Sequence, residues 1–221
     1  MDAPRPNPDT NQLHSPTALK NLSQTSFMLA FFTAFWTGFM VFWALHGEVF
    51  PGIVPIAVGA ALVGFAVWLL VRSIKCARIV AAIVDEDPSG AGGAGKDSAA
   101  KKWDIVFTLQ GCAIGVGAAV LAILGQYVYI VPVVLLIVGL HFIPIGMLYK
   151  TGIHYVVAGA DFAAAAWGII TLLTTTPGGS FPMPAFVDSA CALVGALSSA
   201  VLGVWIIRTI KQGAATTKVS S

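Results

Sequence analysis

The sequence predicts an all-α integral membrane protein with six transmembrane helices. Of its 221 residues, 57% are hydrophobic and only 10% are charged, whereas a soluble domain carries about a quarter charged residues. So few charges cannot keep the surface of a soluble protein wet. A bilayer core about 30 Å thick requires about 20 apolar residues as a helix, and six stretches of the chain reach that length. The composition therefore argues against a soluble globular protein.

The six predicted spans are joined by short connections, with one exception. The spans cover residues 27–46, 52–72, 104–124, 128–149, 153–174 and 185–207. The long connection holds Asp85-Glu86-Asp87-Pro88 and then a Gly/Ala/Ser run that is typical of a flexible linker. We therefore expect five segments in one bundle: a polar N-terminal tail over 1–26, a first hairpin over 27–72, a linker over 73–103, a four-helix block over 104–207 and a C-terminal tail over 208–221.

Two features concern the first hairpin. Its first apolar run is full length and lacks an Ala-x-Ala exit, so the first span is expected to remain in the mature protein rather than leave with a signal peptide. After Arg72, apolar residues recur at helical spacing, which would let the second helix continue along the membrane surface; they are Ile79, Val80, Ile83 and Val84. The alternative is a helix that frays here, because acidic residues are unfavourable at a helix C-terminus.

The positions of the basic residues predict the orientation. With six spans, both tails, the region from Arg72 to Lys102 and the loop at Lys150 share one side, and they carry all twelve Lys and Arg residues. Basic residues in short loops are retained in the cytoplasm. We therefore expect both termini to be cytoplasmic in a multi-pass protein of the cell membrane, with anionic lipid at its basic face. The Ala/Gly-rich composition fits a bacterial cytoplasmic membrane.

A weak internal repeat suggests three tandem helical hairpins. The second and sixth spans end alike, with Trp68 and Arg72 in one and Trp205 and Arg208 in the other. The alternative is that prolines at outer entries and basic residues at cytoplasmic exits are general habits of membrane helices.

Small residues at four-residue spacing predict close helix packing. Such residues leave a smooth groove in which neighbouring backbones can approach; they are Gly111 and Gly115 in the third span, and Gly195, Ser199 and Gly203 in the sixth. We expect these faces to build the core of the protein itself, although a homo-oligomer or a membrane partner would use them in the same way. Trp36 is the exception among the aromatic residues near span ends, since it lies at mid-depth.

Two ionisable residues lie well inside the spans. His141 precedes the end of the fourth span and Asp161 follows the start of the fifth, each by eight residues, so both should lie about 12 Å inside the cytoplasmic boundary. A short turn joins these antiparallel helices, which predicts a direct His–Asp contact. Ionisable groups at this depth are costly and are usually functional. The alternative is an interhelical hydrogen bond that only holds two helices together.

Further polar residues surround this pair. Pro144 cannot donate to the helical hydrogen-bond ladder and is expected to loosen the helix around His141. His154 and Tyr155 should lie at the mouth of the same region, and Gln110 of the third span at a comparable depth. Glu48 and Asp188, at the outer face, are interpreted as interfacial.

Several kinds of chemistry are not expected. The sequence has no recognisable catalytic motif and no cluster of metal ligands at suitable spacing, so neither an enzyme nor a metal or other cofactor is predicted. The three cysteines are read as free thiols, and a net charge of +2 implies no nucleic-acid-binding domain. The favoured hypothesis is a protein that binds or moves a small solute or a proton at His141 and Asp161. The alternative is a non-catalytic membrane scaffold or partner subunit. A third reading, an intramembrane enzyme that uses His and Asp as acid and base, ranks last because no nucleophile or metal set is evident.

Overall fold

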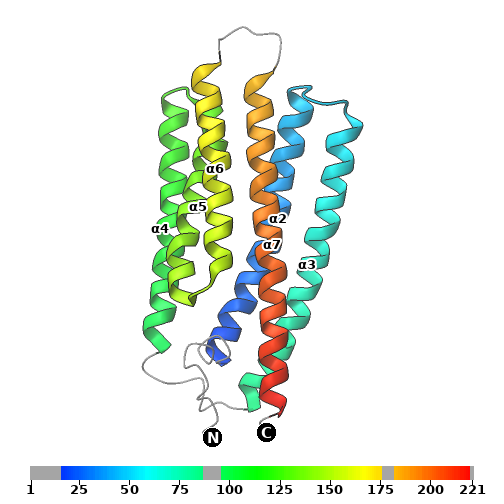
Figure 1. Cartoon of the computed structure of the whole chain (residues 1–221), viewed down its shortest axis with the longest axis vertical. Coiled ribbons are helices and arrows are strands. Elements are labelled where there is room, and N and C mark those ends of the chain that lie inside the picture. Colours follow the sequence, from blue (N-terminus) through cyan, green and yellow to red (C-terminus); the bar gives the residue numbers. More distant parts are fainter. Residues whose placement is uncertain (1–15, 87–95, 176–181, 220–221) are drawn as a thin grey trace, which may run out of the picture.

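The computed structural model of the chain describes residues 16–86, 96–175 and 182–219, and these residues form an all-helical bundle. Its elements are α2 (Pro16–His46), α3 (Ile53–Glu86), α4 (Lys96–Ile123), the short 3₁₀ turn η2 (Tyr127–Tyr129), α5 (Ile130–Tyr149), α6 (Gly152–Thr174) and α7 (Met183–Val219) (Figure 1). Within these described residues, six helices are long and apolar enough to cross a membrane. The prediction of an all-α protein with six such helices is confirmed, and it suggests a multi-pass membrane protein.

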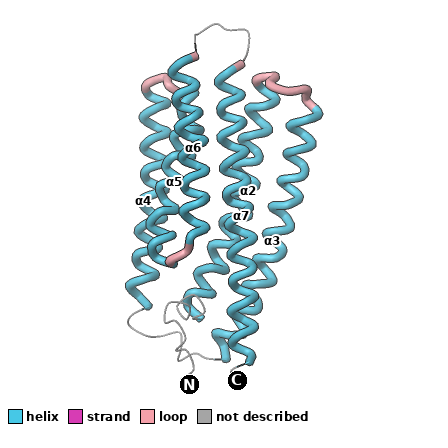
Figure 2. Tube along the Cα trace, in the orientation of Figure 1, coloured by secondary structure: helices cyan, strands magenta, loops and turns pink. Residues whose placement is uncertain are grey.

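Helix α7 lies at the centre of the bundle. It packs most extensively against α2, and it also contacts α3, α5 and α6, whereas α4 packs mainly against α5 (Figures 1 and 2). The pairs α2–α3, α4–α5 and α6–α7 each pack side by side, as tandem hairpins require, but the proposed repeat of three hairpins stays a prediction. Helix α7, which belongs to the predicted four-helix block, packs most closely on α2 of the first hairpin, so the hairpin and the block form one bundle.

The close contact between α2 and α7 depends on glycines. A Cβ atom at Gly195 would lie 2.8 Å from the ring of Trp36, and one at Gly203 would lie 3.2 Å from the side chain of Leu69 in α3. Ser199, between the two glycines, is also buried. The small face of α7 therefore admits large side chains from two neighbouring helices, and Trp36 at mid-depth is one of them.

The small face of α4 differs from its prediction. A Cβ atom at Gly111 or Gly115 would meet nothing within 4 Å, and both residues are exposed. The reason is that α4 packs mainly on one neighbour and turns this face away from it. Within one chain these two glycines are therefore not part of the core, contrary to expectation.

Four helices extend well beyond their predicted spans. Helix α2 begins at Pro16 rather than at residue 27, α3 continues to Glu86, α4 begins at Lys96 rather than at residue 104, and α7 continues to Val219. The extensions of α2, α3 and α7 carry buried apolar residues that belong to the same core; among them are Leu19, Leu22, Val80, Ile83 and Ile210. The segments 1–26, 73–103 and 208–221 are therefore partly helical. The second helix does continue, as one alternative predicted, but Val80 and Ile83 are buried in protein rather than laid on a membrane surface; the side chain of Val84 lies outside the described residues.

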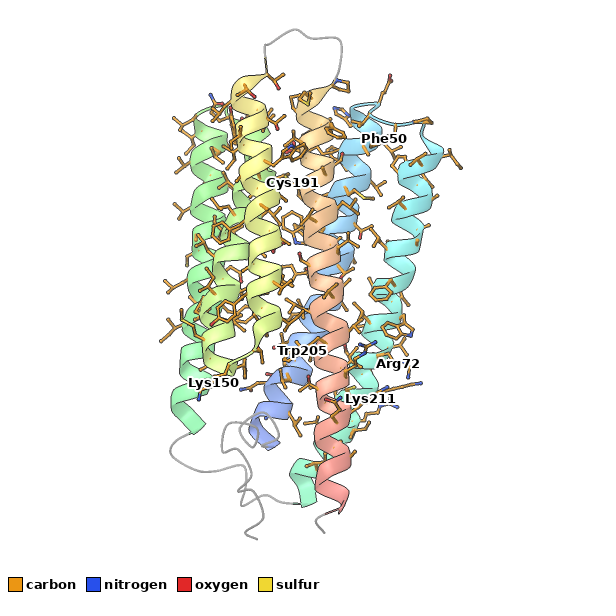
Figure 3. The ribbon with its side chains drawn as sticks, viewed as in Figure 1. Phe50, Arg72, Lys150, Cys191, Trp205 and Lys211 are labelled. Atoms are coloured by element: carbon orange, nitrogen blue, oxygen red, sulfur yellow. The ribbon has the colours of Figure 1, made fainter. Side chains whose placement is uncertain are left out.

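The basic residues gather at one end of the bundle. Figure 3 shows Arg72, Lys150 and Lys211 toward the end where α7 finishes, and Phe50 toward the opposite end. This arrangement is the one that the six-span topology requires. That the basic end faces the cytoplasm stays a prediction.

Candidate functional site

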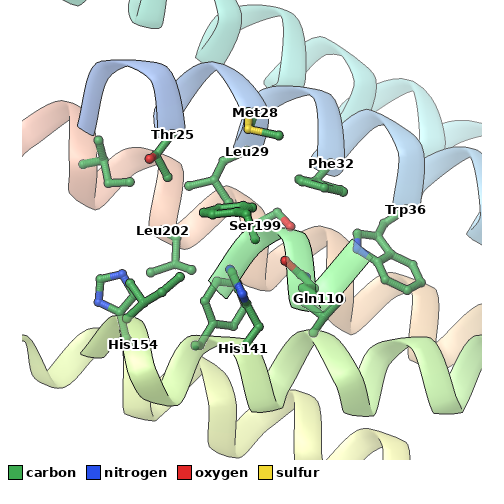
Figure 4. A pocket seen from close by; sticks show the side chains of 15 residues that line it. Thr25, Met28, Leu29, Phe32, Trp36, Gln110, His141, His154, Ser199 and Leu202 are labelled. Carbon is green, nitrogen blue, oxygen red and sulfur yellow. The ribbon is translucent and has the colours of Figure 1, made fainter. Parts of the chain in front are cut away.

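A partly enclosed cavity lies between α2 on one side and α4 and α5 on the other (Figure 4). It has about 40 Å³ of space for water, and one water molecule needs about 10–15 Å³ measured in this way. The cavity exists because α2 does not pack closely against α4 or α5. We call it the His141 cavity; its walls are Thr25, Met28, Leu29, Phe32, Trp36, Phe107, Gln110, Val138, His141, Phe142, Ile145, His154, Ser199, Leu202 and Ile206.

His141 supplies the main polar group of this cavity. Its side chain is buried, and its Nδ1 atom has no hydrogen-bond partner among the described residues. The backbone of Val106 in α4 lies within hydrogen-bonding reach of the ring, and the ring of Phe107 stands edge-on to it at 4.6 Å. A neutral imidazole has one donor and one acceptor nitrogen. One polar atom of His141 is therefore left without a partner beside an aromatic wall.

Other polar side chains around the cavity differ in whether they already form hydrogen bonds within the protein. The Nδ1 atom of His154 lies 2.6 Å from the hydroxyl oxygen of Thr151, and the hydroxyl of Thr25 donates to the carbonyl oxygen of Asn21 at 2.8 Å. Gln110, from α4, lies beside His141 (Figure 4). His141 and Gln110 are therefore the residues best placed to meet a bound molecule.

The structure does not join His141 to Asp161. Asp161 is fully buried between α5 and α7, where the hydroxyl of Ser198 donates a hydrogen bond of 2.6 Å to its Oδ1 atom. A Cβ atom at Gly139 would lie 3.1 Å from the Cβ atom of Asp161, so Gly139 is the part of α5 that faces it. His141 follows two residues later, which is about 200° around the helix. The expected direct contact is therefore absent, because the two side chains point to different sides of α5.

Of the remaining predicted site residues, His154 is buried inside the bundle, whereas Pro144 and Tyr155 are exposed on its surface. His154 is buried, and its ring stands edge-on to Trp205 at 5.5 Å; it shares the His141 cavity rather than lying at its mouth. Pro144 and Tyr155 are exposed on the outer faces of α5 and α6. Helix α5 runs without a break through Pro144. Neither of these two exposed residues lines the cavity.

Sequence reasoning missed the burial of Asp188. This side chain is fully buried, and neither of its carboxylate oxygens has a hydrogen-bond partner among the described residues. Its position near the start of α7 suggested the interface, but α7 is the central helix and its neighbours cover it there. Glu48, by contrast, is exposed. The signal that could have revealed Asp188 is the run of small residues along α7, which marks a helix surrounded by others.

The described residues contain no group of three or more His, Cys, Asp or Glu side chains that could hold a metal ion. Cys76 and Cys191 are buried free thiols, and Cys112 is an exposed one. The chemistry available at the His141 cavity is therefore hydrogen bonding and proton exchange by imidazole. No protein-family model, curated protein or solved structure matches the chain, so its function is inferred from the residues of the cavity.

Proposed function

We propose that the protein binds a small, uncharged solute in the His141 cavity and moves it across the membrane. The observation that carries the proposal is that His141 lines the cavity and that its buried Nδ1 atom has no partner among the described residues. A buried polar group without a hydrogen bond costs about 1–3 kcal/mol. A ligand that supplies the missing hydrogen bond would recover that energy.

The lining indicates the chemical class of the solute. None of the lining residues is Asp, Glu, Lys or Arg, so an ion would find no counter-charge there except from histidine. Aromatic rings supply much of the wall, and apolar walls with a few placed polar groups are typical of sites for small molecules; the rings are those of Phe32, Trp36, Phe107 and Phe142. The site therefore favours a small molecule with an apolar body and one hydrogen-bonding group. In this proposal Asp161 holds α6 to α7 and is left out of the binding site.

The test is replacement of His141 by phenylalanine, which keeps a ring and removes both nitrogens. We expect at least a tenfold loss of affinity and of flux, since about 1.4 kcal/mol corresponds to one factor of ten. Small neutral solutes would be screened with the purified protein in nanodiscs through the fluorescence of Trp36, with Trp36→Phe identifying that signal. Flux would be measured in proteoliposomes.

The matched control is Tyr155→Phe, because Tyr155 is exposed on the outer face of α6. The control should bind and transport like the unmodified protein. If His141→Phe folds and leaves both binding and flux unchanged, the proposal is wrong. If His141→Phe loses binding while even the unmodified protein shows no flux, the cavity is a binding or sensing site rather than part of a transporter.

A second candidate function is a scaffold or partner subunit, and one observation favours it. The outer face of α4 carries the exposed residues Gly111, Cys112 and Gly115, at a spacing that membrane helices use to pair. If two copies pair through this face, mild oxidation of intact membranes should join them through Cys112, since Cys76 and Cys191 are buried. The covalent dimer would be seen by non-reducing electrophoresis. Cys112→Ser should abolish it, and a dimer that persists in that variant would contradict pairing through α4.

A further inference from the structure

A larger groove lies on the outer surface of the bundle, between α3 and α6. Its volume is about 580 Å³. Helices α3 and α6 each pack against α7 but not closely against each other, so α7 forms the base of the groove. Its lining includes Leu62 and Phe65 of α3, Ile153 of α6, and Val201, Trp205 and Arg208 of α7. We call this space the α3–α6 groove, and it shares no residue with the His141 cavity.

The length of the groove along α7 matches the thickness of one leaflet of a bilayer. Along α7 its lining runs from Leu197 to Arg208, which is about 16 Å of helix. The hydrocarbon core of a bilayer is about 30 Å thick. The groove therefore spans about half the membrane, and it ends at Arg208 on the side where Arg72, Lys150 and Lys211 gather (Figure 3).

The charge of the groove lies at that end alone. Arg208 is the one ionisable residue in the lining, and the other lining residues are apolar or aromatic. Its side chain is exposed, and no carboxylate of the described residues forms an ion pair with it. Trp205 lies one turn further into the membrane, where an amphipathic ring suits the headgroup boundary. An apolar groove that ends in a cation is complementary to an anionic phospholipid, because the apolar groove suits the acyl chains and the cation suits the negatively charged headgroup.

We propose that the α3–α6 groove binds one anionic phospholipid of the leaflet at the basic end. The Arg208 guanidinium holds the phosphate, which it can contact through two parallel N–H donors. One acyl chain lies along α7 between Leu62 and Phe65 on α3 and Ile153 on α6. The lipid then bridges two helices that pack closely on α7 but not on each other, and so it stabilises the packing of the bundle.

The experiment compares lipid retention by the full chain and three variants in native mass spectrometry. The protein is exposed to equal amounts of phosphatidylglycerol and phosphatidylcholine. Arg208→Gln removes the cation, and Val201→Trp fills the groove from a position whose side chain is 49% exposed. Lys75→Gln is the matched control, since Lys75 is an exposed basic residue near the same end that does not line the groove.

The unmodified protein and Lys75→Gln should retain one phosphatidylglycerol in preference to phosphatidylcholine. Arg208→Gln should lower that preference about fivefold, because one basic residue near the membrane surface contributes about 1 kcal/mol, and Val201→Trp should lower retention of both lipids. Equal losses in Lys75→Gln and Arg208→Gln would overturn the proposal in favour of general surface charge. Unchanged retention by Val201→Trp, or no preference between the lipids, would overturn it in favour of annular lipid only. Circular dichroism and size-exclusion profiles verify that each variant is folded.

Discussion

Replacing Gly195 by leucine should destabilise the folded bundle by about 1–3 kcal/mol or more, which is the usual cost of forcing extra atoms into a packed core. Even a single Cβ atom at this position would lie 2.8 Å from the ring of Trp36. Trp36 is only 3% exposed, so nearly all of its ring is in contact with neighbouring atoms that would have to shift with it. We expect a lower midpoint of thermal unfolding in detergent and a smaller monodisperse peak in size-exclusion chromatography.

The matched control for this prediction is Gly115→Leu. It makes the same chemical change in another membrane helix, at a glycine with nothing within 4 Å, and substitutions at such open positions usually change stability by less than about 0.5 kcal/mol. The double variant Trp36→Leu/Gly195→Leu should recover part of the lost stability, since it makes room for the new side chain. Equal stability of Gly195→Leu and Gly115→Leu would show that α2 and α7 do not approach as described.

The number and order of the helices could be predicted from the sequence because they depend on local composition. Each span needs only a sufficient run of apolar residues, and the sorting of all basic residues to one side fixes an even number of spans. The extensions of α2 and α7, unlike that of α3, could not be predicted in this way. Leu19 and Ile210 stand next to Lys20 and Lys211 in segments with several polar residues, so they do not raise the mean hydropathy there; only the packing of α2 and α7 reveals their role.

The depth of the candidate site residues in the bundle could be predicted from the sequence, but the direction in which their side chains point could not. His141 and Asp161 do lie on neighbouring antiparallel helices joined by a short turn, and Asp161 lies opposite Gly139, two residues from His141. Depth follows from counting residues along an axis. The direction in which a side chain points depends on which faces of α5 are covered by α4 and by α6, and that is decided by packing between helices that are distant in the sequence. The sequence therefore indicated the two residues and paired them incorrectly.

Two buried carboxyl groups should respond in opposite ways to the same substitution. Leucine reproduces the branching of aspartate with methyl groups in place of oxygens. At Asp161 it removes the Oδ2 atom, which has no partner among the described residues, but also the Oδ1 atom that accepts from the Ser198 hydroxyl. Because that buried hydroxyl then loses its acceptor, Asp161→Leu should lower the free energy of unfolding by about 1–3 kcal/mol. At Asp188 it removes two oxygens that have no partner among the described residues. Because a buried polar group without a hydrogen bond costs energy, Asp188→Leu should leave the stability unchanged or raise it.

Both variants would be measured by thermal unfolding in the same detergent, with Asp161→Asn and Ser198→Ala as controls. Asparagine keeps an oxygen that can accept from Ser198, so Asp161→Asn should be nearly neutral. Ser198→Ala should cost about 1 kcal/mol, as interhelical hydrogen bonds in membranes do.

A marked loss of stability in Asp188→Leu would mean that Asp188 is satisfied in the membrane by water or by a bound cation. A more stable Asp188→Leu protein that has lost solute flux would show that this unpaired acid is kept for function at a cost in stability, because proteins tolerate such groups where activity needs them.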